Sequence, residues 1–149
     1  MNILEQDKFL QSKGIDSNKR YESKEMFDKC NKLIFEEETR RKKQIKKYCN
    51  YHMYTDIFPY EVINVISEQT VEIRSMKAEL DPTWKPDFSV GGFFGHTHNN
   101  RSQRYNFKSD PDGKVIRVRW SKANRKWQKG KYMTFIMNDS PERFYDFNF

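Results

Sequence analysis

Three histidines and two cysteines are the residues of this sequence best suited to bind a metal ion, and four of them form two close pairs. The pairs are Cys49 with His52, and His96 with His98. Alternate residues of a strand share a face, so one thiolate and three imidazoles could together form an acceptable zinc set. Because two separate segments would have to meet, the pattern favours a polar bend that contains histidines. We therefore predict no metal site and no cofactor.

Other potentially catalytic side chains lack the spacing of known motifs. Asp110 and Asp112 could hold a divalent ion, but they lie in a turn sequence, where aspartate bonds the local backbone. The glycines of Gly91–Gly95 match neither common phosphate-binding pattern, and the run that starts at His98 is too short to indicate a nuclease. No serine or cysteine lies in a nucleophile motif. The sequence predicts a protein that is not an enzyme, with a metal-dependent enzyme as an alternative.

The strongest chemical signal is a basic stretch. Residues 99–133 contain eleven lysines and arginines and two aspartates, so their net charge of +9 exceeds the +7 of the whole chain. A surface of this kind attracts nucleic acid and other polyanions, although a solvated strand face is the alternative. The predicted nucleic-acid or partner-binding residues are Arg101, Arg104, Lys108, Arg117, Arg119, Lys122, Arg125, Lys126 and Lys129.

Alternation within this stretch predicts a strand with one buried and one wet face. In residues 114–121, apolar side chains alternate with Arg117 and Arg119. Aromatic residues that escape the core could stack on nucleic-acid bases beside these cations. The candidates are Tyr105, Trp120, Trp127 and Tyr132. Strand alternation favours a core position for most of them.

The composition indicates a small folded protein under a highly charged surface. The chain has 149 residues, enough for one domain or one small domain with an appendage. Hydrophobic residues make up 36% of it, but aromatics reach 15%, which favours an aromatic core over disorder. Two cysteines favour a reducing compartment, and there is no apolar run long enough to span a membrane. We expect a soluble intracellular protein.

The N-terminal part predicts a long charged helix from Ser23 to about Tyr48. Ser23 is a candidate N-cap, and acid-then-base pairs four residues apart support the second half of the helix. The run Arg40–Lys47 is interpreted as a solvated helix end, with contact to a phosphate backbone as the alternative. Cys30 and Cys49 both fall in this helix, too far apart to form a disulfide.

Short strands separated by turns are expected from Tyr51 onward. Residues 60–66 and 71–77 predict a hairpin, Trp84 anchors a loop between prolines, and Ser109–Gly113 is a turn. Phe144–Phe149 alternates and predicts a final aromatic strand that closes the core. The fold class is α+β: an N-terminal helical arm at residues 1–50, then a small antiparallel β-barrel or roll, SH3-like or similar, at residues 51–149.

Four segments carry a resemblance to other proteins. They are YTDIFPYEVINV (Tyr54–Val65), VEIR (Val71–Arg74), SQRYNFKSDPDG (Ser102–Gly113) and FYDFNF (Phe144–Phe149). With them, the region from about residue 48 to the end, roughly two thirds of the chain, resembles a group of small uncharacterised proteins of phages, prophages and related mobile elements. The motifs look architectural, and no established activity comes with them. The resemblance implies a small accessory protein of viral or mobile-element origin in the cytoplasm of a bacterial host.

Charge and resemblance together predict a non-enzymatic accessory protein. Its basic β face would bind RNA, DNA or a host nucleoprotein complex, with no membrane partner. One version is a defence inhibitor such as an anti-CRISPR, which is suggested by the small size of the chain and by its implied origin. The alternatives are a structural virion or assembly protein and, second, a metal-dependent enzyme.

Overall fold

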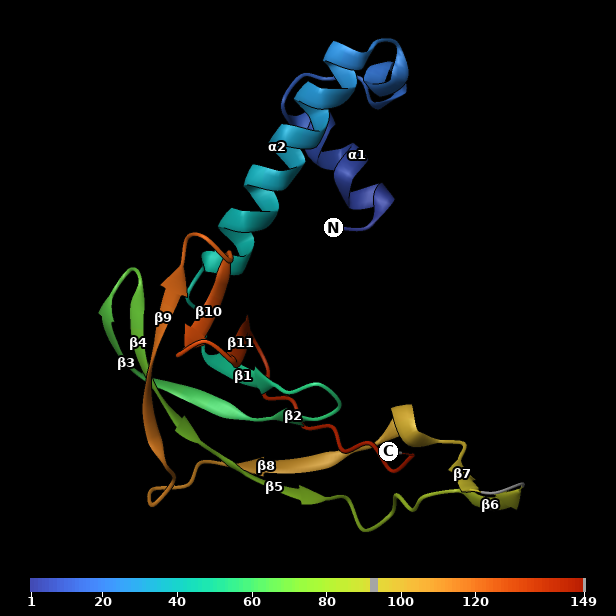
Figure 1. Ribbon diagram of the computed structural model, residues 1–149, viewed down its shortest axis with the longest axis vertical. Coiled ribbons are helices and arrows are strands. Elements are labelled where there is room, and N and C mark those ends of the chain that lie inside the picture. The colour runs from blue at the N-terminus through green and yellow to red at the C-terminus, as the bar shows by residue number, and fades with distance from the viewer. Residues whose placement is uncertain (92–93, 149) are drawn as a thin grey trace. The chain divides into compact units, whose positions relative to one another are not determined.

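The computed structural model of the chain describes residues 1–91 and 94–148, and it divides the chain into two compact units (Figure 1). The first unit is Met1–Gln44 and the second is Ile45–Phe149. Each unit has its own hydrophobic core. No helix among the described residues is both long enough and apolar enough to cross a membrane.

The N-terminal unit consists of helices joined by a tight break. Its elements are α1 (Ile3–Ser12), the 3-10 helix η1 (Ser17–Tyr21) and α2 (Lys24–Lys43). The Asn2 side chain caps α1, and the predicted N-cap Ser23 accepts a hydrogen bond from the Met26 N–H at 3.1 Å. Gly14 ends the first helix with a φ of +75°, a conformation that glycine adopts without strain. Leu10, Cys30 and Ile34 form the small core.

The charged half of α2 is held by ion pairs along its surface. Glu37 accepts hydrogen bonds from Arg40 at 2.8 Å and from Arg41 at 2.9 Å. These two guanidinium groups lower the pKa of the Glu37 carboxyl to about 2. The Glu37–Arg41 pair has the predicted spacing of four residues, whereas Arg40 binds Glu37 rather than Glu36.

The predicted end of this helix, at about Tyr48, is wrong. Helix α2 ends at Lys43, and Tyr48–His52 forms strand β1. Ile45 and Cys49 pack with the core of the second unit, so tertiary packing overrides the helical pattern there. The two cysteines therefore do not share a helix. Cys49 is on β1, whereas Cys30 is on α2 and is buried in the core of the first unit.

In the described part of the second unit, six antiparallel strands close into a barrel. Their order is β11, β10, β9, β4, β3 and β1, and β1 pairs back with β11. The strands are β1 (Tyr48–His52), β3 (Tyr60–Ser67), β4 (Thr70–Ser75), β9 (Val115–Ser121), β10 (Lys126–Lys129) and β11 (Met133–Asn138), with β2 (Ile57–Phe58) beside β1. The predicted α+β class, with N-terminal helices and a small antiparallel barrel, is confirmed. The finer expectation of an SH3-like barrel stays a prediction.

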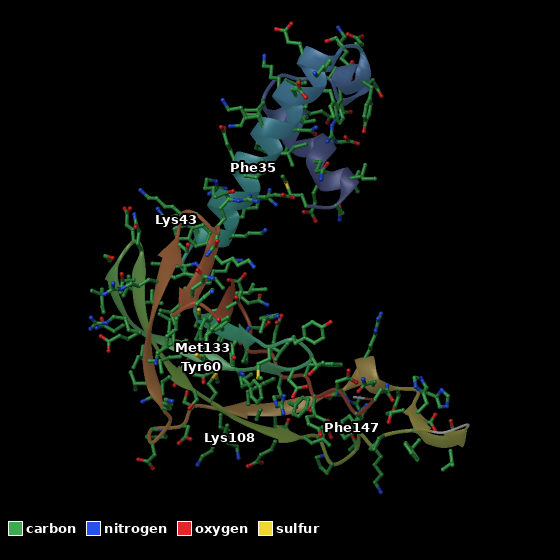
Figure 2. The ribbon with its side chains drawn as sticks, in the orientation of Figure 1. Phe35, Lys43, Tyr60, Lys108, Met133 and Phe147 are labelled. Atoms are coloured by element: carbon green, nitrogen blue, oxygen red, sulfur yellow. The ribbon has the colours of Figure 1, made fainter. Side chains whose placement is uncertain are left out.

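Aromatic rings fill the barrel. Trp120 and Trp127 face each other across β9 and β10 with ring centroids 5.8 Å apart, and Phe135 from β11 is 2% exposed. Tyr60 and Met133, both labelled in Figure 2, pack against this cluster. Its other buried members are Cys49, Val71, Ile73, Ile116, Val118 and Met137. The alternation predicted for residues 114–121 is confirmed in full.

An extension that the sequence did not predict leaves the barrel between β4 and β9 (Figure 1). It contains two small sheets and a 3-10 helix: β5 (Lys77–Leu80) with β8 (Tyr105–Lys108), β6 (Phe88–Gly91) with β7 (Phe94–Thr97), and η2 (Asn100–Ser102). Trp84 anchors the loop before β6, as predicted: it is 6% exposed, and its ring lies 5.5 Å from that of Phe147. Gly92, which belongs to the glycine-rich run Gly91–Gly95, lies outside the described residues.

The predicted closing strand at residues 144–149 is also wrong. Its described part pairs as a strand only through one bridge, between Ile57 and Phe144, and Phe149 lies outside the described residues. Side-chain amides replace the ladder. The Gln103 amide bonds both the N–H and the C=O of Tyr145, at 3.0 and 2.5 Å, and the Asn148 amide bonds those of Thr97, at 2.6 and 3.1 Å. The tail therefore packs on the extension rather than in the barrel core.

A third amide fixes the start of this tail to the barrel. Asn50 is fully buried on β1. Its amide nitrogen donates to the Ser140 carbonyl at 3.1 Å, and its carbonyl oxygen accepts from the Glu142 N–H at 3.1 Å. Both halves of one side chain are thus used by the backbone of a distant segment.

We expect Asn50→Ala to lower the free energy of unfolding by about 1–3 kcal/mol, because two backbone groups would lose their buried side-chain partner. Urea denaturation monitored by tryptophan fluorescence measures the change. The matched control is Asn106→Ala, which truncates an exposed asparagine of β8 and should stay within about 0.5 kcal/mol of the unsubstituted protein. Equal stability of the two variants would contradict the role of Asn50.

Candidate nucleic-acid interface

The hairpin of β9 and β10 gathers cations without acids. Residues 114–132 contain eight lysines and arginines and no aspartate or glutamate. Six of the nine predicted binding residues belong to this hairpin: Arg117 and Arg119 on β9, Lys122 and Arg125 in the turn, and Lys126 and Lys129 on β10. They are the part of the predicted surface that the structure brings together.

Core packing decides which side chains face solvent. Because Trp120 and Trp127 point into the barrel, their strand neighbours point outward. The register places Arg119 between Thr70 of β4 and Gln128 of β10. Arg117 and Arg119 therefore project from a sheet, whereas Lys122 and Arg125 project from the turn that follows β9.

One acid faces the cations of the hairpin from the neighbouring strand. Glu72 of β4 lies opposite Arg117, and their charged groups are 3.6 Å apart. The Glu72 carboxylate also accepts a 3.4 Å hydrogen bond from Asn64. Within the part of the chain that the structure describes, no ion pair is formed by Arg119, Lys122, Lys126 or Lys129.

The remaining predicted binding residues lie elsewhere. Arg101 is in η2, Arg104 precedes β8, and Lys108 ends β8, so all three belong to the extension. Arg104 is engaged there, with Asp81 at 3.8 Å and the Thr83 hydroxyl at 3.0 Å. The nine predicted binding residues are therefore divided between two sheets, because the chain changes sheets after Lys108.

That change of sheets occurs in the predicted turn, and the turn accounts for the paired aspartates. The Asp110 side chain accepts from the Asp112 N–H at 3.2 Å, and its carbonyl accepts from the Gly113 N–H at 2.9 Å. A Cβ on Gly113 would lie 2.3 Å from the Ser75 carbonyl oxygen, so glycine is required for this approach. The aspartates serve the turn, as predicted.

The four aromatic candidates differ in how far they are buried. Trp120 and Trp127 are core residues, and the hydroxyl of half-buried Tyr105 donates to Gln103 at 2.7 Å. Tyr132 is 83% exposed, in the turn between β10 and β11. Sequence reasoning missed its outward-facing neighbours on β11, Thr134 and Ile136, which the alternation with Phe135 and Met137 would have identified.

The four candidate metal ligands are not brought together. Cys49 lies in the barrel core, where burial raises the pKa of its thiol to about 12. Burial also lowers the pKa of His52, whose Nε2 lies 3.5 Å from the Glu142 carboxylate. His96 and His98 contact each other on the extension, with ring centroids 4.9 Å apart. In residues 1–91 and 94–148, no three His, Cys, Asp or Glu side chains are placed to share a metal ion.

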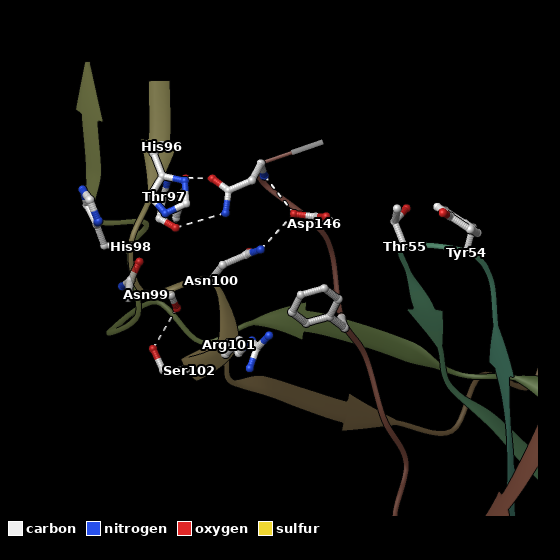
Figure 3. Close-up of a pocket in the computed structure, with 12 residues that line it drawn as sticks. Tyr54, Thr55, His96, Thr97, His98, Asn99, Asn100, Arg101, Ser102 and Asp146 are labelled. Carbon is white, nitrogen blue, oxygen red and sulfur yellow. Dashed lines mark hydrogen bonds between the residues drawn. The ribbon is translucent and has the colours of Figure 1, made fainter. Parts of the chain in front are cut away.

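An open pocket of about 780 Å³ lies beside these histidines (Figure 3). Polar side chains that line this pocket are hydrogen-bonded to each other. The Asn100 amide donates to Asp146 at 2.9 Å, and the Asp146 N–H donates to Asp56 at 3.0 Å. Three of the four segments singled out in the sequence contribute Asp56, Gln103 and Asp146 to this network and to the Gln103–Tyr145 pair, and these contacts hold the tail in place. The pocket supports an architectural role for these residues.

No protein-family model, curated protein or solved structure matches this chain.

Proposed function

We propose that this protein binds nucleic acid through the outer face of the β9–β10 hairpin, and that it acts without catalysis. One observation carries the proposal: eight cations and no acid lie in residues 114–132, on two strands whose tryptophans are buried in the core and in the turns beside them. Phosphate groups that replace counterions around such a face give favourable, salt-sensitive binding.

Rigidity and polar neighbours support the same reading. The cations of β9 do not have to be ordered on binding, because the barrel already fixes their backbone, and this lowers the entropic cost of association. Gln128 and Thr134, which lie side by side next to Arg119, add neutral hydrogen-bonding groups. A basic face of this kind suits contact with RNA, DNA or a nucleoprotein complex, and it is opposite in sign to a DNA mimic.

The biological setting of the proposal comes from the resemblance to phage and mobile-element proteins. A small accessory protein in a bacterial cytoplasm meets host complexes that carry RNA or DNA. Inhibition of a defence complex, as by an anti-CRISPR, is one such role, and its motive is the size and implied origin of the chain rather than any residue of the hairpin.

The double variant Arg117→Glu with Arg119→Glu tests the face directly. We expect its affinity for labelled RNA or DNA to fall by about 10- to 100-fold, because two charge-assisted contacts would be lost. The salt dependence should also weaken, with a log–log slope smaller by about 1.4 for single strands or 1.8 for duplex. Fluorescence anisotropy across a salt series measures both quantities.

The matched control is Arg101→Glu with Lys108→Glu, which makes the same change in net charge on the extension. It should bind nearly as well as the unsubstituted protein. If both double variants lose affinity equally, total charge rather than the hairpin determines binding, and the proposed face is wrong.

Glu72→Gln should have the opposite effect. The substitution keeps the shape of the side chain and its place beside Asn64, but removes the negative charge that Arg117 now faces at 3.6 Å. We expect a gain in affinity of about twofold to tenfold at low salt, which shrinks as salt screens the charges. Unchanged affinity at low salt would show that a ligand does not reach Arg117.

A second candidate function, an assembly protein, rests on the free edge of β3. Strand β1 pairs with β3 only at Tyr48 and Glu61, so from Ile63 onward this edge has no strand partner among the described residues. Ile63, Val65 and Ile66 are exposed there, and residues 62–67 carry no charge. Uncharged free edges are sites of strand pairing between chains.

If this edge joins copies of the chain, Val65→Lys should convert an oligomer into a monomer, because a lysine at an edge opposes strand addition. Light scattering after size-exclusion chromatography, at several protein concentrations, gives the mass of each species. A monomer before substitution would remove the assembly function and leave nucleic-acid binding unaffected.

A further inference from the structure

The exterior of the barrel carries two different strips side by side. Cations occupy β9 and β10, whereas Tyr132 in the turn before β11 and Ile136 on β11 are 83% and 48% exposed. The register places Gln128 opposite Thr134, so neutral polar side chains lie between the strips. Two inter-strand spacings, about 10 Å, separate β9 from β11.

From this arrangement we infer that the surface takes a single-stranded nucleic acid, with phosphates on the cations of β9 and β10 and a base stacked on Tyr132. The inference rests on the proposed function and specifies its ligand. In a duplex the phosphates face outward and the base faces are stacked inside, so no base face is available to stack on an exposed ring. An unpaired strand offers charge and apolar base faces together, as the two strips do.

Tyr132 is the ring placed for this task. Two other aromatic residues of the hairpin, Trp120 and Trp127, are buried in the core. Lys131 lies with its ammonium group 5.4 Å from the Tyr132 ring centroid, so a cation already accompanies the ring. Tyr132 lies in the turn that joins β10 to β11, directly before Met133, the first residue of β11. A base stacked on this ring would lie beside the end of β10, the strand that carries Lys126 and Lys129.

Tyr132→Ala tests the inference. We expect its affinity for labelled oligo(U) or oligo(dT) of about 16 nucleotides to fall about tenfold, the loss of one base stack, with little change for blunt duplex DNA or for heparin, a polyanion without bases. Tyr132→Phe keeps the ring and should restore binding. Because Tyr132 is exposed, thermal unfolding of both variants should match that of the unsubstituted protein.

Tyr54→Ala is the matched control, because Tyr54 is 99% exposed but lies in the loop between β1 and β2. It should leave all four affinities unchanged. A stronger loss with oligo(U) than with oligo(dT) would identify RNA as the ligand, and the reverse would identify single-stranded DNA; either supports the inference.

Two results would overturn it. Equal losses of Tyr132→Ala on oligonucleotides, duplex and heparin would show a general effect on the surface rather than stacking. No loss on any ligand, while Arg117→Glu with Arg119→Glu still weakens binding as expected, would reject the single-strand ligand and leave the proposed function standing. Failure of both variants to change binding would instead reject the hairpin itself.

Discussion

The pairing of β1 with β11 is the contact on which the second unit depends, because it converts a twisted sheet into a closed barrel. Closure gives Trp120, Trp127 and Phe135 one shared interior. Because these rings point inward and side chains alternate along each strand, Arg119 and Gln128 must point to the exterior. Strand alternation thus places the aromatic rings inside and the cations outside at the same time. A shift of one residue in the strand register would exchange the two sets of side chains.

Local patterns were readable where one strand or one turn explained them. The alternation in residues 114–121, the N-cap Ser23 and the turn after Lys108 all follow from neighbouring residues. Pairing partners do not. Nothing local says that β8 joins β5 while β9 joins β4, so the predicted basic face was divided between two sheets. The end of α2 was missed for the same reason, because Ile45 and Cys49 pack against core residues that are distant in sequence.

Segments that carry the phage-protein resemblance and residues that carry charge have different tasks. The amides of Gln103 and Asn148 each bond both backbone groups of one residue, which lets an irregular tail dock as firmly as a strand. The cationic hairpin, in contrast, falls between the segments of the resemblance, after Gly113 and before Phe144. The contacts that dock the tail and the cations of the hairpin are thus supplied by different segments of the chain.

The long reach of the barrel closure also sets the order in which the chain can fold during synthesis. Helices α1 and α2 rely on local contacts and can form as soon as they leave the ribosome. Asn50, by contrast, waits for partners 90 residues later, at Ser140. Until then the newly made β9 and β10 remain without β11, with their tryptophans and cations exposed together. A nascent chain in this state exposes basic and apolar side chains together until the last strand is in place.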